Sequence, residues 1–192
     1  MKKYELTSEK KVINGIELHR IKALKSFGNI KEGELGGWIE SEKNLSQRGD
    51  AWVCRHAIVY DNAWVYGNAT ISGNATVSDN AWVGGYAIVG GYAKVYGNAE
   101  VYGNATIGGY ATVRGNAVIS GNAKVYENAD YIVFKNWWSS GRYFTWTRSN
   151  NKWKVGCFYG NGEELIAKAY KDSEKSGREY ERVVKYVESI LK

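Results

Sequence analysis

Two histidines, His19 and His56, are the side chains of this sequence whose ordinary pKa lies near neutrality. A base with such a pKa can deprotonate a hydroxyl or an amine, so these two residues are the candidates for catalysis. His56 stands where other units of a repeat place asparagine, which suits a corner residue that makes hydrogen bonds. His19 lies in a stretch expected to form a strand. The sequence favours the simpler interpretation, in which both are structural or solvated.

The remaining reactive side chains do not form a recognisable catalytic or metal-binding motif. Cys54 and Cys157 lack the spacing of metal ligands, and we expect both to stay reduced. Walker, G-x-S-x-G, H-E-x-x-H and paired-cysteine motifs are missing from the sequence. We therefore predict no metal site and no cofactor.

A basic and aromatic region near the C-terminus is the candidate for ligand binding. Aromatic faces stack on bases, and Arg or Lys side chains hold phosphates. A hairpin that interleaves both types would suit a nucleotide or a single strand, whereas the modest charge argues against strong binding to duplex nucleic acid. The alternative is that the aromatic side chains only seal the end of the fold. The candidate residues are Trp137, Trp138, Arg142, Tyr143, Trp146, Arg148, Lys152, Trp153 and Lys154.

A six-residue repeat occupies the middle of the chain, between Gly49 and Asp130. Alanine recurs at every sixth position from Ala51 to Ala129, and Val or Ile stands two residues later in thirteen of the fourteen units. Gly-Asn precedes the alanine in many units, as in Gly67-Asn68-Ala69, so the unit is G-N-A-x-V-x. A period of six gives no continuous helical stripe, which excludes a helix.

The repeat predicts a mainly β protein built around a parallel β-solenoid. Side chains alternate between the faces of a strand, so Ala and Val share one face while the residue between them points outward. We expect the Gly-Asn pair to turn the chain, because both residues tolerate left-handed backbone angles. Three corners close a coil of eighteen residues, and fourteen units give about 4.7 coils, roughly 22 Å long.

The two ends of the repeat are expected to carry caps, because open strand ends pair with other molecules. Residues 1–48 are predicted to be β-rich, with a hairpin turn at Asn14-Gly15. Residues 49–131 form the solenoid. Residues 132–192 are predicted to contain an aromatic hairpin over 142–159, a helix capped by Asn161, and a second helix after Gly177. Its apolar stripe should pack on the hairpin or on a neighbouring subunit.

Stacking the coils at eighteen residues places several apolar side chains on one outward face. An exposed patch of this kind marks an interface or a ligand surface, unless the terminal segments cover it. We expect this face to make the protein a homo-oligomer. The interface candidates are Trp64, Tyr66, Trp82, Tyr102 and Val118.

The pattern resembles the hexapeptide-repeat, left-handed parallel β-helix superfamily, as in Val65-Tyr66-Gly67-Asn68-Ala69. The resemblance implies left-handed coils and trimers, and many relatives are acyltransferases with a histidine base between subunits. The repeat lacks the inserted loops on which acyl-carrier grooves of these enzymes commonly depend. Carbonic anhydrase relatives use three histidines, and this chain has two. Nearly pure G-N-A-x-V units, preceded by Gly36-Gly37-Trp38-Ile39-Glu40, also look like solenoid proteins of bacteriophages and prophages.

The hydropathy pattern predicts a protein of the cytosol, which would be the bacterial host cytosol for a phage protein. No run of 18 apolar residues spans a membrane, and the N-terminus does not look like a signal peptide.

The positive charge of the chain is concentrated outside the repeat. Residues 131–192 carry 12 basic and 7 acidic side chains, whereas residues 49–130 carry 4 and 6. A basic end attracts anionic partners.

Taken together, these features favour a non-catalytic binding protein of the phage type. Its partner would be a small anionic, nucleotide-like ligand or a host protein, including a component of host defence. Two alternatives stay open: an acyltransferase that uses His56 or His19, and a structural virion or spacer protein.

Overall fold

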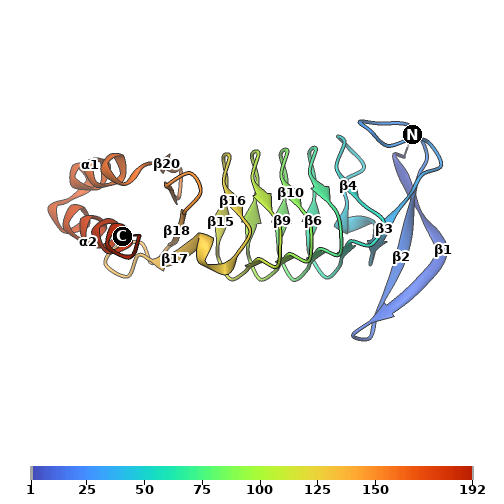
Figure 1. Ribbon diagram of the computed structural model, residues 1–192, viewed down its shortest axis with the longest axis horizontal. Coiled ribbons are helices and arrows are strands. Elements are labelled where there is room, and N and C mark those ends of the chain that lie inside the picture. Colours follow the sequence, from blue (N-terminus) through green and yellow to red (C-terminus); the bar gives the residue numbers. More distant parts are fainter. Residues whose placement is uncertain (1, 192) are drawn as a thin grey trace.

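The described part of the chain, residues 2–191 of a computed structural model, is a stack of short strands between two caps (Figure 1). A long hairpin covers one end of the stack, and a small antiparallel sheet with two helices covers the other. The mainly β, parallel solenoid that the repeat predicts is confirmed.

The N-terminal hairpin consists of β1 (Tyr4–Ile13) and β2 (Ile16–Ala23), which pair antiparallel. Asn14 and Gly15 have φ angles of 52° and 81°. Positive φ at both central residues is the geometry of a two-residue type I′ turn, so the hairpin prediction is confirmed.

Parallel stacking begins at β3 (Leu35–Ile39), which pairs antiparallel with β2 and in parallel with a strand of the repeat. A 3-10 turn, η1 (Glu42–Asn44), follows. Leu45 then makes a parallel bridge with Val65 and is buried, as the valines of the repeat are. The solenoid therefore starts ahead of the first alanine of the repeat, within residues 1–48.

Within residues 2–191 the repeat forms thirteen two-residue strands. Each strand contains the outward residue and the inward Val or Ile of its unit. They are β4 (Trp52–Val53), β5 (Ile58–Val59), β6 (Trp64–Val65), β7 (Thr70–Ile71), β8 (Thr76–Val77), β9 (Trp82–Val83), β10 (Ile88–Val89), β11 (Lys94–Val95), β12 (Glu100–Val101), β13 (Thr106–Ile107), β14 (Thr112–Val113), β15 (Val118–Ile119) and β16 (Lys124–Val125).

Each strand pairs in parallel with the third strand along the chain, as Val65 does with Val83 and Val83 with Val101. The pairing builds three sheets around one core. The seven-stranded sheet has the order β1-β2-β3-β5-β8-β11-β14, and the five-stranded sheet has the order β16-β13-β10-β7-β4. The third, here called the tryptophan sheet, has the order β15-β12-β9-β6.

The core of the solenoid is a double row of small and branched side chains. The alanines and the Val or Ile residues of the repeat are fully buried from Ala51 to Val125. Because alternate residues of a strand share a face, the residue between each pair points out of the solenoid. Alternating small and larger side chains fill the narrow interior without voids.

At each corner with a Gly-Asn or Asp-Asn pair, only the first residue of the pair has a positive φ angle. Gly97 has a φ angle of 75° and Asp79, in the same corner one coil earlier, has 57°, whereas the asparagines of the repeat do not adopt positive φ. The prediction that the Gly-Asn pair turns the chain is confirmed, and the positive φ falls on its first residue alone. The asparagines form a ladder instead, in which Asn62 Nδ2 donates to Asn80 Oδ1 (3.2 Å) and Asn80 Nδ2 to Asn98 Oδ1 (3.3 Å).

The solenoid backbone has a direction. The N–H groups of the outward strand residues donate toward the C-terminal end, as Trp52 N does to Ala69 O and Trp64 N to Ala81 O (both 2.9 Å). The alanine carbonyl groups of the first coil and the N–H groups of the outward residues in the last coil are consequently left without a partner in the stack. Buried backbone groups need partners, so the two caps must supply opposite hydrogen-bonding groups.

The N-terminal cap supplies donors to these carbonyl groups. Lys3 Nζ donates to Gly49 O (3.2 Å) and Ala51 O (2.8 Å). Asn44 Nδ2 donates to Asp61 O (3.0 Å) and Ala63 O (2.9 Å).

The C-terminal cap supplies acceptors to the last N–H groups. Thr145 Oγ1 accepts from Val118 N (2.9 Å), and Ser149 Oγ accepts from Lys124 N (2.7 Å). Asn128 Oδ1 accepts in the same way from the β14 backbone (2.8 Å). Side chains, rather than a further strand, thus end the stack.

The C-terminal cap begins where the fourteenth unit of the repeat departs from the solenoid. Ala129 is exposed in a 3-10 turn, η2 (Asn128–Asp130), so the predicted fourteenth strand does not form. The cap sheet follows, in the order β17-β18-β19-β20. Its strands are β17 (Tyr131–Lys135), β18 (Tyr143–Thr147), β19 (Lys152–Val155) and β20 (Phe158–Gly160). The predicted hairpin is confirmed for β18 and β19, and a turn with positive φ at Gly156 separates β19 from β20.

Two helices complete the cap, α1 (Gly162–Asp172) and α2 (Glu174–Ile190). Asn161 Oδ1 accepts from Glu164 N (2.8 Å), which confirms the predicted N-cap. The predicted start of the second helix after Gly177 is wrong, because α2 begins at Glu174, three residues before Gly177. The ring of Tyr170 lies where a Cβ on Gly177 would be, so glycine here allows close helix packing.

The C-terminal cap has a hydrophobic core of its own. Tyr180, Val184 and Val187 of α2 pack against Phe144 and Trp153 of the cap sheet, so the apolar stripe of α2 packs on the predicted hairpin.

Candidate binding surfaces

The two histidines lie on different elements. His19 is half-buried on β2, with its Nε2 3.4 Å from Glu17 Oε1. Glu17 also accepts a hydrogen bond from Lys10 Nζ (2.7 Å), and this bond lowers the pKa of the carboxyl group. His56 is exposed at a corner. Neither histidine lines the groove described below, so the structure does not pair either one with a substrate-sized cavity.

Three of the tryptophans predicted to bind a ligand are buried. Trp146 and Trp153 are each 1% exposed and lie opposite one another on β18 and β19, and Trp138 is 7% exposed. All three belong to the core beneath the helices of the cap. This burial argues against their predicted role as ligand-binding residues.

The other six residues of that set do not form one surface. Arg142 and Arg148 flank the two ends of β18, which a strand of this length separates by about 20 Å. Trp137 is 72% exposed beyond β17, and Lys152 and Lys154 are half-buried on β19. The sixth residue, Tyr143, lines a groove against the solenoid.

The tryptophan sheet carries an exposed aromatic patch, which we define as Trp64, Tyr66 and Trp82. The rings of Trp64 and Tyr66 are stacked with centroids 4.4 Å apart, and Trp64 meets Trp82 edge-on at 5.8 Å. Tyr66 also lies over Gly84, where any larger side chain would collide with its ring. Trp64 is 37% and Trp82 49% exposed. The three rings thus form one rigid and partly solvated surface.

The remaining interface candidates continue this surface toward the C-terminal cap. Tyr102 and Val118 are half-buried on the same sheet, one and two coils beyond Trp82. Glu100, paired in register with Trp82, is the charged residue among them. Burial, and then the charge of Glu100, raise the pKa of the Tyr66 phenol.

A groove of about 950 Å³ lies where the seven-stranded sheet meets β17. Thr112 of β14 and the residues that directly follow β11 and β14 form one wall, and β17 with the start of β18 forms the other. The side chains that shape it are Tyr96, Arg114, Asn116, Tyr131, Val133 and Tyr143.

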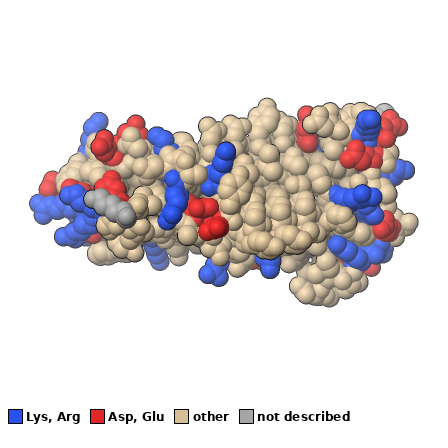
Figure 2. Space-filling view, viewed as in Figure 1, with Lys and Arg blue, Asp and Glu red and all other residues tan. Residues whose placement is uncertain are grey.

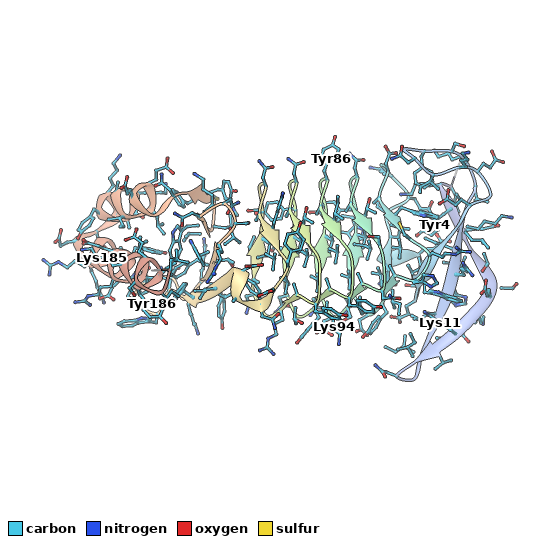
Figure 3. All side chains as sticks on the ribbon, viewed as in Figure 1. Tyr4, Lys11, Tyr86, Lys94, Lys185 and Tyr186 are labelled. Carbon is cyan, nitrogen blue, oxygen red and sulfur yellow. The ribbon has the colours of Figure 1, made fainter. Side chains whose placement is uncertain are left out.

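A second hollow of about 450 Å³ continues the groove toward the N-terminal cap. It shares Asp79 and Tyr96 with the first, includes Lys94, and ends at Ile13 and Asn14 of the hairpin turn. The hairpin projects beyond the solenoid at this end (Figure 1), and Lys94 lies on the side of the solenoid opposite Tyr86 (Figure 3). The groove therefore runs along the seven-stranded sheet between the two caps.

The groove carries more positive than negative charge. Arg114 and Lys94 make no ion pair with any of residues 2–191. Lys135 Nζ lies 5.7 Å from the ring centroid of Tyr143, which adds a third cation at the rim. The acid of the groove, Asp79, accepts a hydrogen bond from Gly97 N (2.9 Å). On the face of the molecule shown in Figure 2, the solenoid carries few charged side chains and the two caps carry more.

Tyr131 fixes one wall of the groove. Its hydroxyl donates to Thr112 O (2.8 Å) and accepts from Arg114 N (3.3 Å). Burial raises the pKa of the phenol, so the group stays protonated and keeps donating. Because the bond holds β17 against β14, the shape of the groove is fixed by the cap that closes the sheet.

Sequence reasoning missed most of the groove. Arg114 and Tyr96 occupy the same position of their units in consecutive coils, so stacking at eighteen residues was the signal that places them in one row. Tyr131 and Val133 come from the strand after the repeat, and only the fold shows that their side chains pack against the solenoid.

Comparison with known proteins supports the solenoid and leaves the activity open. A family model described as the YdcK beta solenoid repeat matches residues 69–85. This match covers about one coil and shows similarity in the repeat unit. A search of curated proteins finds no match to the chain.

The described residues also contain no group of three or more His, Cys, Asp and Glu side chains placed to hold a metal ion. Among them, no helix has the length and apolar character needed to cross a membrane.

Proposed function

We propose that this protein is a non-catalytic binding scaffold, assembled from several copies, that captures a small anionic ligand. The observation that carries the proposal is the aromatic patch Trp64, Tyr66 and Trp82. Large aromatic side chains held rigid and half-exposed on a flat sheet are typical of the centre of a protein interface. A soluble monomer rarely keeps such a contiguous apolar surface.

The assembly we propose is a homotrimer joined through the tryptophan sheets. Trp64 and Trp82 lie on β6 and β9, and the solenoid surface between the caps carries few charged side chains (Figure 2), so copies can approach without bringing like charges together. Of the strand residues that point outward from this sheet, Glu100 is the one that carries charge. An interface of this kind gains mainly from apolar burial.

The ligand we propose is anionic because the chain is basic outside the repeat. The formal net charge is +6, and the C-terminal residues contribute most of it. The G-N-A-x-V units look like those of phage and prophage solenoids, which makes the cytosol of a bacterial host the setting we propose. Capture of a nucleotide-like signal of host defence is one role that such a scaffold would serve.

Light scattering after size-exclusion chromatography tests the assembly. We expect the wild-type protein to have three times the 21.5 kDa mass of the chain. Trp82→Lys should yield monomers, because a charge would have to be buried in an apolar interface. The matched control is Ile88→Lys, at the equivalent outward position of the next sheet, where Ile88 is 46% exposed.

Two outcomes contradict the assembly. The first is a wild-type protein that is monomeric across a dilution series. The second is equal loss of assembly in Trp82→Lys and Ile88→Lys, because the effect would then not be specific to the aromatic patch. Circular dichroism of both variants shows that each still forms the solenoid.

A further inference from the structure

We propose that the groove between the seven-stranded sheet and β17 binds a small ligand that joins an anionic group to a planar ring, as a nucleoside monophosphate does. This inference rests on the proposed binding function and goes beyond it by naming the site and the chemistry of recognition. The groove lies on a different sheet from the aromatic patch, so assembly of copies leaves it open.

The anionic group is recognised by cations that have no protein partner. Arg114 lines the groove and makes no ion pair within residues 2–191, and the same holds for Lys94 in the adjoining hollow. A guanidinium presents planar, forked donors that match a phosphate or carboxylate. Lys135, over the Tyr143 ring, places a further cation at the rim. The carboxylate of Asp79 offsets one of these charges and is itself held by Gly97 N.

The ring is recognised by tyrosines and by an apolar wall. Tyr143 is 43% exposed at one side of the groove, and Tyr96 is half-buried at the other. Ile132 and Val133 of β17 supply the apolar surface between them. Aromatic rings stack on the face of a base with little preference for its identity, so this wall suits a planar ring in general.

The floor of the groove offers space and a free donor. A Cβ on Gly115 would meet nothing within 4 Å, in contrast to Gly97 below it, where a Cβ would lie 2.9 Å from the Gly115 backbone. Asn116 is the last member of the asparagine ladder, and its Oδ1 accepts from Asn98 (3.5 Å). Its Nδ2 has no acceptor among the described residues and is therefore available to a ligand.

The glycine at this position gives a precise way to fill the site. Asp79 stands two coils earlier in the same corner and adopts a φ of 57°, close to the 68° of Gly115. Asp and Asn tolerate this backbone conformation, so Gly115→Asn and Gly115→Asp should both fold. The first fills the floor with a neutral side chain and the second adds a negative charge of nearly the same size.

Calorimetric titration of the full chain with AMP, adenosine and inorganic phosphate tests the site. We expect AMP to bind more tightly than either fragment, because ring and anion both contribute. Arg114→Gln should lower the affinity for AMP about tenfold or more and leave the affinity for adenosine unchanged, as the loss of a charge-assisted hydrogen bond predicts. Gly115→Asp should weaken AMP more than Gly115→Asn does. Arg142→Gln, an equal charge change outside the groove, should have little effect.

The possible results separate the site from the function. In one result, AMP binds with an affinity that falls in Arg142→Gln and not in Arg114→Gln. This result would refute the groove as the binding site and leave the proposed ligand capture standing. If adenosine binds as tightly as AMP, the requirement for an anion is overturned. If AMP, adenosine and phosphate all fail to bind the wild-type protein, the ligand chemistry is overturned, and the assembly proposal stands or falls by light scattering. Unchanged thermal midpoints without ligand show that the variants are folded.

Discussion

The two ends of the solenoid are capped by opposite hydrogen-bonding chemistry. At the N-terminal end, the Lys3 ammonium and the Asn44 amide donate to carbonyl groups of the first coil. At the C-terminal end, Thr145 and Ser149 hydroxyl oxygens accept from N–H groups of the last coil. The difference follows from the parallel stack, in which the N–H group of every outward strand residue points toward the C-terminal end. For these groups, the first coil needs donors and the last coil needs acceptors.

The two ends also differ in how they join the core. Tyr4 and Ile21 of the N-terminal cap belong to the same buried cluster as the alanines and valines of the solenoid. The C-terminal cap has a separate cluster, which includes Trp146. β17 is the junction, because Tyr131 packs toward the solenoid and Ile132 toward the cap core. We infer that the N-terminal cap folds with the solenoid, whereas the C-terminal cap can open by itself.

Replacing Trp52 or Trp146 with alanine tests this difference with the largest effect. Each change removes a buried indole and should cost about 3–5 kcal/mol. Trp52 packs edge-on to Phe27 at 5.4 Å inside the continuous core, so Trp52→Ala should destabilise the solenoid as a whole. Trp146→Ala should loosen the C-terminal cap and leave the solenoid folded. Hydrogen exchange followed by mass spectrometry reports the two regions separately. Equal loss of protection in the solenoid for both variants would show that the caps do not differ.

Removing the buried ammonium tests the donor cap. Lys3→Met keeps the length of the side chain and leaves the carbonyl groups of Gly49 and Ala51 without their donor. Hydrogen bonds from a charged group contribute about 2–3 kcal/mol, so the free energy of unfolding should fall by this amount. Lys2→Met is the control, because Lys2 makes an exposed ion pair with Glu42 (2.6 Å) that should contribute less than about 1 kcal/mol. Chemical denaturation measures both, and equal effects would refute a special role for Lys3.

Removing one hydroxyl tests the acceptor cap. Thr145 is 1% exposed, and its Oγ1 accepts from Val118 N. Thr145→Val keeps the shape and should cost about 1–2 kcal/mol, because a buried N–H group loses its acceptor. Thr145→Ser keeps the acceptor and should cost less. If valine were tolerated better than serine, shape rather than hydrogen bonding would hold this end of the stack.

The solenoid itself was predictable because every unit repeats the same local pattern. Ala and Val at fixed positions define the buried face, and the eighteen-residue coil places Trp64 beside Trp82 without knowledge of anything else. The turns were also predicted, but not which residue of a Gly-Asn pair takes the positive φ, because either tolerates it. In the structure the first residue takes it, and the asparagine side chains form a ladder.

The caps and the groove depend on contacts between distant residues, which the sequence does not display. Lys3 meets Ala51, and Thr145 meets Val118, across long stretches of chain. The aromatic pattern of β18 and β19 predicted strands but did not show which face the helices cover. For that reason Trp146 was expected at a ligand surface and lies in a core.

The smallest expected effect that separates the donor cap from the acceptor cap is the pH dependence of stability. Burial lowers the pKa of Lys3 from 10.5 to about 8, because desolvation outweighs the attraction of Asp50. Between these two values the unfolded chain binds more protons than the folded chain, so the contribution of Lys3 to the free energy of unfolding rises with pH. It is fully present above pH 10.5 and is lost as the pH falls through about 8. The acceptor cap relies on neutral hydroxyl groups of Thr145 and Ser149, which do not titrate in this range.

The difference in free energy of unfolding between the wild-type protein and Lys3→Met should therefore widen from pH 8 to pH 10. The corresponding difference between the wild-type protein and Thr145→Val should stay constant. Above pH 10 the comparison ends, because burial raises the pKa of Tyr4 and the unfolded state then gains from ionisation of the phenol. Urea denaturation across this range measures both gaps. A gap for Lys3→Met that narrows would mean that the ammonium charge itself stabilises the first coil, and that the donor cap acts through charge rather than through hydrogen bonds alone.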